Sequence, residues 1–334
     1  MPAVGPRDLR AWPITPTSID RAPHGFNNET YFVDAREGQF VLRVYRSTAE
    51  VGRVHDEHDL LGALALQELP FAVPTPMPTR EGDTVAVLEG ADGPRLATLF
   101  TRIPGSPAEK TPRHARLGGR ALAQVDLVLA RLDRPVRAPV RIRDVHPLVD
   151  DPIAALDELD LGERSVVARG LLERVDESHD ALAGALPWQI IHGDFAFPNV
   201  LIDQNVVTGF LDFEFAAPDM RAADLATALH VACVSSTAEE RWPLLEALIA
   251  GYGRSIPLDP AEAAAMPDLM RRRSAIGVVH WIAKFRQSVG SRQDVVDRID
   301  RGIALSQWLD ENAVRIAATA LGTPNARTPR KSAR

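Results

Sequence analysis

The sequence is poor in cysteine, in lysine and in long apolar runs. Its single cysteine, Cys233, cannot form an internal disulfide and lies in an apolar helical pattern, so we predict a small core residue and a reducing compartment. The start of the chain is interrupted by Pro2, Pro6 and Pro13 and lacks the continuous apolar stretch of a signal peptide. Because no later run reaches membrane-spanning length, we expect a cytoplasmic protein.

An excess of positive charge is also missing. The chain has 38 Lys and Arg against 45 Asp and Glu, a formal net charge of -7. Such a chain has no general attraction to phosphate backbones or anionic membranes, so we expect a small-molecule partner and neither nucleic acid nor membrane. The oligomeric state stays open. The 334 residues, 45% hydrophobic and 25% charged, suit a folded protein of two lobes.

The first third of the chain alternates in the manner of strands. The pattern predicts a hairpin over 28–45, a helix over 47–69 and two strands over 84–90 and 94–103. The second hairpin strand carries Val41 and Arg43 on one face, because side chains two residues apart share a face of a strand. Pro104 and Gly105 mark a break between lobes.

The remainder is predicted to be mainly helical. Helices are expected over 113–132, 151–159 and 163–186, then a strand over 188–192, a hairpin around 203–205 and further helices from about 221. Thr237 with Glu240 forms a capping box, and Asp259 with Glu262 combines an N-cap with a favourable acid in the first turn. We therefore expect a small sheet-rich lobe followed by a larger helical one.

The informative string is IIHGDFAFPNVLID, which places Asp194 and Asn199 five residues apart in a loop between two strands. Phosphoryl transfer from ATP needs a carboxylate that accepts the proton of the attacking hydroxyl and oxygen ligands that hold magnesium. Asp194 fits the first role and Asn199 the second. Gly193 permits a backbone turn that a residue with a Cβ resists. His192 is predicted to hold the loop rather than carry a proton.

A second acidic element follows in GFLDFEFAAPDMRAADLA. Asp212 is predicted at the end of a strand, 13 residues after Asn199, with Glu214 on the same face by strand alternation. Asp212 is our main candidate magnesium ligand, while Glu214 could support a second ion or only a hydrogen-bond network. Asp224, just inside a helix, is expected to be a buried acceptor that braces the backbone of the catalytic loop.

The order HGDxxxxN, DFE and DLA resembles the aminoglycoside phosphotransferase superfamily, relatives of the protein kinases, and within it homoserine kinase type II. GFNNETYFV, QFVLRVYR and ALIAGYGRSIPLDPAEAAAMPDL extend the similarity over roughly residues 15–320. The resemblance implies an α+β, bilobal, protein-kinase-like fold. It implies a small N-terminal antiparallel-sheet lobe that binds nucleotide over 15–103, a larger helical lobe for catalysis and substrate over 104–321, and a disordered tail over 322–334.

The resemblance also implies ATP and magnesium as cofactors and assigns roles to individual positions. The matching positions are Asp194 as catalytic base, Asn199 and Asp212 as metal ligands, Glu57 on the first helix, and an adenine-binding hinge over 100–103 that includes Thr101 and Ile103.

One position departs from the pattern of related kinases, which often carry a lysine on the third strand. The chain has three lysines, Lys110, Lys284 and Lys331, and the matching position is Arg43. Arginine keeps its charge and can bind phosphate with two nitrogens, so an Arg43–Glu57 pair could replace the lysine, although the geometry differs. Val41 would face the adenine.

The amino-terminal loop also lacks the three-glycine phosphate loop of many kinases. Gly25 and the backbone amides near Asn27 and Asn28 are left to cover the phosphates.

These residues predict an enzyme that moves the γ-phosphoryl of ATP to a hydroxyl of a homoserine-like amino acid, an amino alcohol or a sugar. Two alternatives remain. Arg43 could mark a nucleotide-binding pseudokinase or regulatory module. An aminoglycoside-type antibiotic kinase could use the acidic stretch 144–163 against a polycationic acceptor, although a solvated helical face explains that stretch as well.

Other functional classes are less well supported. A metal-dependent hydrolase would want more histidine or paired acid ligands, and His230 and His280 lie in apolar helical patterns. A protein-serine kinase would need a longer activation segment between Asp212 and Asp224. The run Arg271, Arg272, Arg273 could present one guanidinium to a substrate carboxylate, or could serve mainly as a solvated surface.

Overall fold

The computed structural model describes residues 4–22, 28–45, 51–90, 93–134, 140–159 and 161–322. The predicted phosphate-covering residues Gly25 and Asn27, and the tail from 323 onward, lie outside the described residues. The chain divides into two compact units. The first unit is Met1–Pro107 with Pro198–Phe215, and the second is Ala108–Phe197 with Ala216–Arg334. The fold is bilobal α+β, with a small antiparallel-sheet lobe and a larger helical lobe, as predicted.

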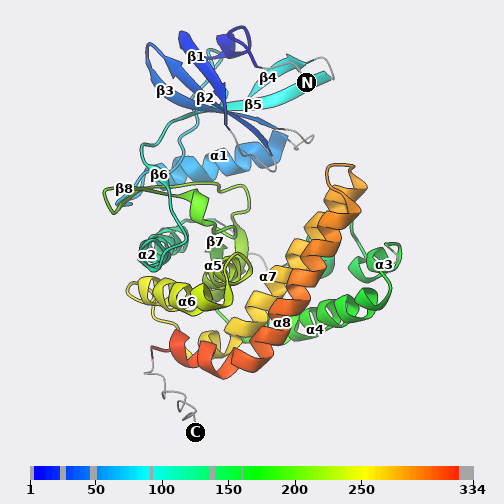
Figure 1. Cartoon of the computed structure of the whole chain (residues 1–334). Coiled ribbons are helices and arrows are strands. Elements are labelled where there is room, and N and C mark those ends of the chain that lie inside the picture. The colour runs from blue at the N-terminus through cyan, green and yellow to red at the C-terminus, as the bar shows by residue number, and fades with distance from the viewer. Residues whose placement is uncertain are drawn as a thin grey trace. The chain divides into compact units, whose positions relative to one another are not determined.

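The first unit is built on a five-stranded antiparallel sheet in the order β1-β2-β3-β5-β4 (Figure 1). Its strands are β1 Pro16–Arg21, β2 Asn28–Ala35, β3 Gly38–Tyr45, β4 Ala86–Gly90 and β5 Gly93–Thr101; a 3-10 turn η1 covers Asp8–Ala11, and α1 covers Val51–Ala65. The predicted hairpin is confirmed, since β2 and β3 pair from Asn28 with Tyr45 to Ala35 with Gly38. The predicted helix ends earlier than expected, at Ala65 rather than near residue 69.

Successive side chains of β3 lie on opposite faces of this sheet. Phe40, Leu42 and Val44 are buried in a core that also contains Leu9 and Trp12. The intervening residues of the strand belong to the other face, against which α1 packs through Val54 and His58. Because the side chains of a strand alternate, Val41 and Arg43 are directed to the face that α1 covers.

His58 of α1 is a buried histidine held between two hydroxyl groups. Its Nδ1 lies 2.6 Å from Thr84 Oγ1, and its Nε2 lies 3.4 Å from Thr98 Oγ1. Burial, then the neighbouring charges of His55 and Arg43, lowers the pKa of His58 from 6.5 to about 4. The imidazole is therefore neutral in the folded protein at neutral pH.

We expect His58 to destabilise the fold in mild acid. Between pH 6.5 and pH 4, His58 is protonated in the unfolded chain but stays neutral in the folded protein. The free energy of unfolding therefore falls as the pH falls toward 4. Between about pH 7.5 and about pH 5 this single group should cost about 2 kcal/mol. Urea unfolding of the wild type and of His58→Gln at both pH values checks this. An equal loss in both proteins would contradict it.

A second small sheet of the first unit is assembled from distant parts of the chain. It has the order β6-β8-β9, with β6 Ser106–Pro107, β8 Val200–Asp203 and β9 Val206–Phe210. The predicted hairpin turn is present, and Gln204 and Asn205 both have positive φ, 43° and 66°, as a two-residue hairpin turn requires. Thr208 Oγ1 donates to Pro104 O at 2.6 Å. The segment 198–215 thus packs with the first unit, whereas the sequence placed it beyond a boundary at 103.

The second unit is mainly helical. Its elements are α2 Pro112–Leu129, η2 Ile142–Asp144, α3 Pro152–Asp157, α4 Glu163–Ala185, β7 Trp188–Ile191, η3 Phe197–Asn199 (which ends in the first unit), β10 Ala217–Met220, α5 Ala222–Val234, α6 Ala238–Tyr252, α7 Pro260–Arg286 and α8 Arg292–Ala320. The long helices α7 and α8 lie side by side (Figure 1). Strand β10, which the sequence did not predict, pairs antiparallel with β7.

Local capping chemistry and close helix packing explain where these helices begin and meet. The capping boxes predicted at Thr237 and Asp259 are both present. Helices α2 and α6 cross at Gly119 and Gly251, where a Cβ would collide with the backbone of the opposite helix. Cys233 is buried, as predicted.

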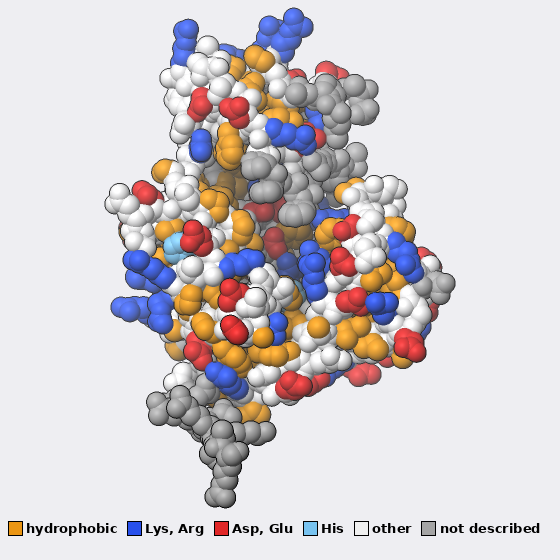
Figure 2. Space-filling view, viewed as in Figure 1, with side chains coloured by type: hydrophobic (Ala, Val, Ile, Leu, Met, Phe, Trp, Pro, Cys, Tyr) orange, Lys and Arg blue, Asp and Glu red, His pale blue; other side chains and the backbone are white. Residues whose placement is uncertain are grey.

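The described surface carries charges of both signs. On the face drawn in Figure 2, basic and acidic side chains are interspersed. Within the described ranges, no helix is both long enough and apolar enough to cross a membrane.

Candidate active site

In the first unit, Arg43 of β3 joins two acidic residues that are far apart in the sequence. Its Nη1 lies 3.2 Å from Glu57 Oε1 on α1, and its Nη2 lies 3.3 Å from Asp212 Oδ1. The side chain of Arg43 is 17% exposed and that of Glu57 is 7% exposed. The guanidinium also lies over the Phe100 ring, 5.5 Å from its centroid. The contact between Arg43 and Glu57 that the sequence suggested is therefore present.

The electrostatics of this cluster keep the arginine charged. Burial alone disfavours the guanidinium cation, but the carboxylates of Asp212 and Glu57 outweigh it and raise the pKa of Arg43. Burial raises the pKa of Glu57, while Arg43 opposes that shift. The cluster holds more negative than positive charge once Glu214 is counted, so a cation would be favoured near Asp212.

The stretch after β9 corrects one prediction. The strand ends at Phe210, and residues 211–216 are irregular, so strand alternation does not decide where Asp212 and Glu214 point. Asp212 has a positive φ of 69°, which turns the backbone sharply. Glu214 instead contacts the start of β2, where Asn28 Nδ2 donates to Glu214 Oε2 at 3.2 Å. A backbone turn, not a strand, presents the two acids.

Asn199 is tied to the same stretch through its backbone. It ends the 3-10 turn η3, and its carbonyl oxygen accepts from the Leu211 amide at 2.7 Å. That bond places Asn199 beside the residue that precedes Asp212. No group of three or more His, Cys, Asp or Glu that could hold a metal occurs among the described residues. Magnesium nevertheless fits, because it is usually held by one or two carboxylates, with water and substrate phosphates completing the shell.

The predicted adenine-binding residues are all in the first unit. Val41 is half-buried in the register that pairs it with Phe100 of β5. Thr101 ends β5, and its amide donates to Thr75 O at 3.2 Å. Ile103 packs on Gly209 of β9, where an added Cβ would lie 2.7 Å from the Ile103 Cγ2 atom. Gly209 is therefore needed for this contact, and the sequence analysis did not single it out.

In the second unit, the loop after β7 is held by one buried carboxylate. Asp224 accepts from the His192 amide at 2.7 Å and from the Gly193 amide at 2.9 Å. Gly193 has φ 77°, the left-handed region that glycine favours. His192 is fully buried, and its Nδ1 accepts from the Asp194 amide at 3.3 Å. The backbone ahead of Asp194 is thus fixed at three successive amides.

Two further buried residues, Asp126 and Tyr252, lie near Asp224, and the sequence analysis singled out neither. Tyr252 of α6 donates to Asp126 Oδ2 of α2 at 2.6 Å. Burial, and then the charge of Asp224, raises the pKa of Asp126 well above its usual range. Asp126 Oδ1 accepts no hydrogen bond from the residues that the structure describes. Burial and the nearby charge of Asp224 both favour the neutral form of the Asp126 carboxyl. Only an apolar helical pattern surrounded these residues in the sequence, so no local signal indicated them.

Replacing Asp224 with asparagine should destabilise the second unit. The amide keeps the size of the side chain but offers one oxygen where two backbone amides need acceptors, which leaves one buried N–H unpaired. We expect a loss of about 1–3 kcal/mol in the free energy of unfolding. Chemical denaturation measures it, with Asp300→Asn as a control because Asp300 is an exposed acid paired with Arg164. Similar losses in both variants would contradict the prediction.

The three consecutive arginines of α7 have different partners. Arg271 contacts Asp268 and Asp310, and Arg272 contacts Asp219 and the carbonyl of Val140. Arg273 Nη2 instead lies 2.6 Å from Asp194 Oδ1. Helical geometry therefore sends two of the three guanidinium groups into structural ion pairs and directs the third to the predicted catalytic base.

The predicted residues thus form two groups. Arg43, Glu57, Asn28, Asn199, Asp212 and Glu214 are linked within the first unit, and His192, Asp194 and Asp224 within the second. Asp194 and Asn199 are five residues apart, a span of at most about 18 Å of extended chain. The convergence of Asp194, Asn199 and Asp212 on one cation stays a prediction.

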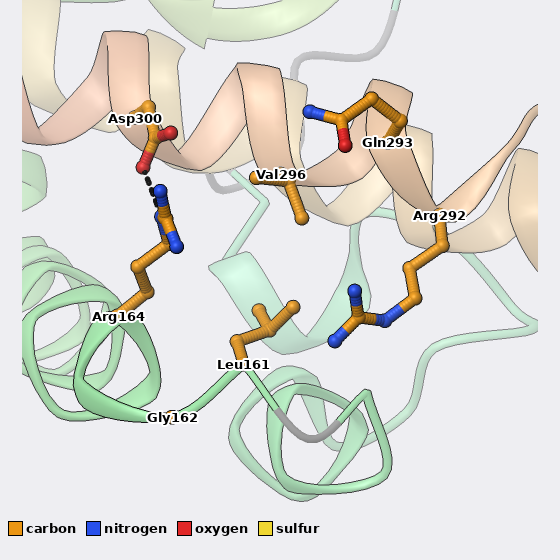
Figure 3. A pocket seen from close by; sticks show the side chains of 7 residues that line it. All are labelled: Leu161, Gly162, Arg164, Arg292, Gln293, Val296 and Asp300. Carbon is orange, nitrogen blue, oxygen red and sulfur yellow. Dashed lines mark hydrogen bonds and ion pairs between the residues drawn. The ribbon is translucent and has the colours of Figure 1, made fainter.

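A pocket of about 400 Å³ lies elsewhere in the second unit (Figure 3). It is lined by Leu161, Gly162, Arg164, Arg292, Gln293, Val296 and Asp300. Its charged groups are already engaged, since Arg164 Nε lies 2.8 Å from Asp300 Oδ1 and Arg292 donates to the Leu159 carbonyl. None of the predicted site residues lines this pocket.

Comparison with known proteins decides the family. The model of the phosphotransferase enzyme family matches residues 18–266, most of the chain and both groups of site residues. The chain belongs to this family. A homoserine kinase of Acidiphilium cryptum is 30% identical over 282 residues, covering 82% of this chain and 84% of its own. The resemblance to homoserine kinases predicted from the motifs is therefore confirmed.

Solved structures of other kinases share the fold. A microcompartment-associated aminopropanol kinase superposes with a TM-score of 0.73 at 23% identity, covering 94% of this chain and 97% of its own. An amicoumacin kinase in complex with AMP-PNP and Ca²⁺ superposes with a TM-score of 0.63 at 17% identity, covering 95% and 93%. As a member of the phosphotransferase family, the protein is an ATP-using kinase that phosphorylates a hydroxyl of a small molecule.

Proposed function

We propose that the protein transfers the γ-phosphoryl of magnesium-bound ATP to the hydroxyl of a homoserine-like amino acid. The observation that carries the proposal is the Arg43 cluster, in which one guanidinium contacts both Glu57 and Asp212. In related kinases a strand cation paired with a helix acid grips the phosphates, and an aspartate nearby holds the metal. Arg43, Glu57 and Asp212 supply the same three groups from β3, α1 and the turn after β9.

In this mechanism Asp194 orients the acceptor hydroxyl and takes its proton as the oxygen attacks the γ-phosphorus. The loop that carries Asp194 is preorganised, because Asp224 and His192 bind its backbone before any substrate arrives. Arg43 binds the α and β phosphates. Val41, Thr101 and Ile103 contact the adenine, and the Asn28 region lies over the phosphates.

Asn199 and Asp212 are the proposed magnesium ligands, with Glu214 as support. Bound magnesium would neutralise charge on the β and γ phosphates. The chemistry of the donor set fits, since amide and carboxylate oxygens suit a hard cation. Asp212 gives one oxygen to Arg43, which leaves its other oxygen for a ligand. Asn28 holds the Glu214 carboxylate in place.

Two acids of the stretch considered for an antibiotic acceptor are paired with arginines. Asp157 pairs with Arg169 at 2.6 Å, and Glu158 pairs with Arg286 at 2.7 Å. Asp151 is used as the N-cap of α3. A polycationic acceptor would have to displace these partners, which favours a small acceptor over an aminoglycoside. Asp160, also part of that stretch, lies outside the described residues.

Phosphate transfer to a panel of acceptors tests the proposal. L-Homoserine, 3-amino-1-propanol, a sugar and an aminoglycoside are each supplied with Mg-ATP, and ADP and the phosphorylated product are quantified. We expect turnover with L-homoserine. Thermal stabilisation by ATP without transfer to any acceptor would instead indicate the pseudokinase alternative. Omission of magnesium should abolish transfer.

A further inference from the structure

Asp194 lies next to a positively charged side chain, the guanidinium of Arg273. Arg273 is its direct partner, with both side chains about a quarter exposed, at 23% and 25%. The Nε atom of Arg273 is buried and has no hydrogen-bond partner in the described part of the chain. Nε and Nη2 lie on one edge of a guanidinium, the edge that binds two oxygens side by side. Asp194 occupies only the Nη2 half of that edge.

A second arginine from α8 adds to this charge. Arg298 lies over the Trp281 ring, 5.1 Å from its centroid. Burial, then Arg301 and Arg273, lowers the pKa of Arg298. The carboxylate of Asp294, one turn earlier on α8, opposes this shift only in part, so a further anion beside Arg298 would stabilise its charge.

The charges of Arg273 and Arg298 also act on His230 of α5. His230 Nε2 lies 2.9 Å from Ser274 Oγ, and its buried Nδ1 has no hydrogen-bond partner in the described structure. Burial, then Arg273 and Arg298, lowers the pKa of His230 to about 3. The histidine is therefore neutral and adds no charge of its own. Its contact with Ser274, the residue after Arg273, places His230 against the same turn of α7.

Space for a ligand exists on the same face of α7. Residues 273, 276, 277 and 280 form a half-buried stripe. A Cβ built on Gly277, one turn after Arg273, would meet no atom of the described residues within 4 Å. A small molecule beside Asp194 can therefore approach this face of the helix closely.

We propose that Arg273 and Arg298 bind a carboxylate of the phosphate acceptor. The acceptor is then a hydroxylated acid, and the enzyme discriminates against amino alcohols and aminoglycosides that lack an anionic group. The inference rests on the proposed function in that Asp194 is taken to face the acceptor. In this arrangement the guanidinium of Arg273 contacts both the catalytic base Asp194 and the carboxylate of the acceptor.

Two probes isolate the carboxylate. L-Homoserine and 3-amino-1-propanol share the hydroxyl, the amino group and the spacing between them, and differ in the carboxylate. We measure kcat/KM for both with wild type, Arg298→Gln and Arg273→Gln. Arg286→Gln is the matched control, because Arg286 is also on α7 but pairs with Glu158.

We expect wild type to prefer L-homoserine, and the ratio of the two kcat/KM values to fall about 10- to 100-fold in Arg298→Gln and in Arg273→Gln. Arg286→Gln should keep the wild-type ratio. If Arg273 only positions Asp194, its variant loses activity on both probes equally, and an unchanged ratio in both variants overturns the inference.

Calorimetric titration of L-homoserine without nucleotide separates this inference from the proposed function. Binding to wild type that weakens at least about 10-fold in Arg298→Gln supports the carboxylate site even if no phosphate is transferred. Transfer to L-homoserine with equal binding by wild type and Arg298→Gln leaves the proposed function intact and overturns this inference. Thermal melting of each variant identifies any that has failed to fold.

Discussion

Replacing Asp194 with asparagine is expected to lower kcat by about 10³-fold or more and to leave nucleotide affinity nearly unchanged. The amide retains the size of the carboxylate but cannot take the proton of the attacking hydroxyl. The proposed nucleotide ligands belong to the first unit, whereas Asp194 belongs to the second. Loss of the base should therefore separate chemistry from nucleotide binding.

Single-turnover phosphate transfer measures the first effect, and titration with a fluorescent ATP analogue measures the second. Asp133→Asn is a suitable control, since Asp133 is an exposed aspartate of the same unit. Parallel losses of turnover and nucleotide affinity would argue that Asp194 binds the nucleotide and is not the base.

Replacing Asp212 with asparagine should remove the dependence of nucleotide binding on magnesium. Asp212 has φ 69°, and asparagine tolerates this left-handed conformation, so the turn should persist. The variant loses the charge proposed to hold the metal and weakens the contact with Arg43. We expect kcat/KM for Mg-ATP to fall about 10²-fold or more.

Nucleotide titrations with magnesium and with EDTA separate the two contributions. Wild type should bind ATP more tightly with magnesium, and Asp212→Asn should show little difference between the two conditions. Asp203→Asn serves as the control, because Asp203 is an exposed aspartate at the end of β8 in the same unit. Retention of the wild-type magnesium effect in Asp212→Asn would rule out the proposed metal role.

Some contacts of the candidate site could be predicted from the sequence, and others could not. The sequence suggested a pair between Arg43 and Glu57, and the two side chains are in contact. It also suggested that Asp224 accepts hydrogen bonds from the loop, and two such bonds are present. It was wrong about strand alternation after Phe210, because the backbone turns at Asp212 before a second residue of that face is reached. Turns at positive φ are hard to foresee where the residue is not glycine.

The elements themselves followed from the sequence, because a period of two or of 3.6 residues, a capping box or a proline acts on near neighbours along the chain. The hairpin of β2 and β3 and the starts of α6 and α7 are of this kind. Tertiary structure decided which side chains meet. It selected Arg273 among three adjacent arginines as the partner of Asp194, and it brought Asp126 of α2 into hydrogen-bond contact with Tyr252 of α6. Those contacts depend on how helices pack across long sequence separations, where burial and charge act through space and leave no local periodic signal.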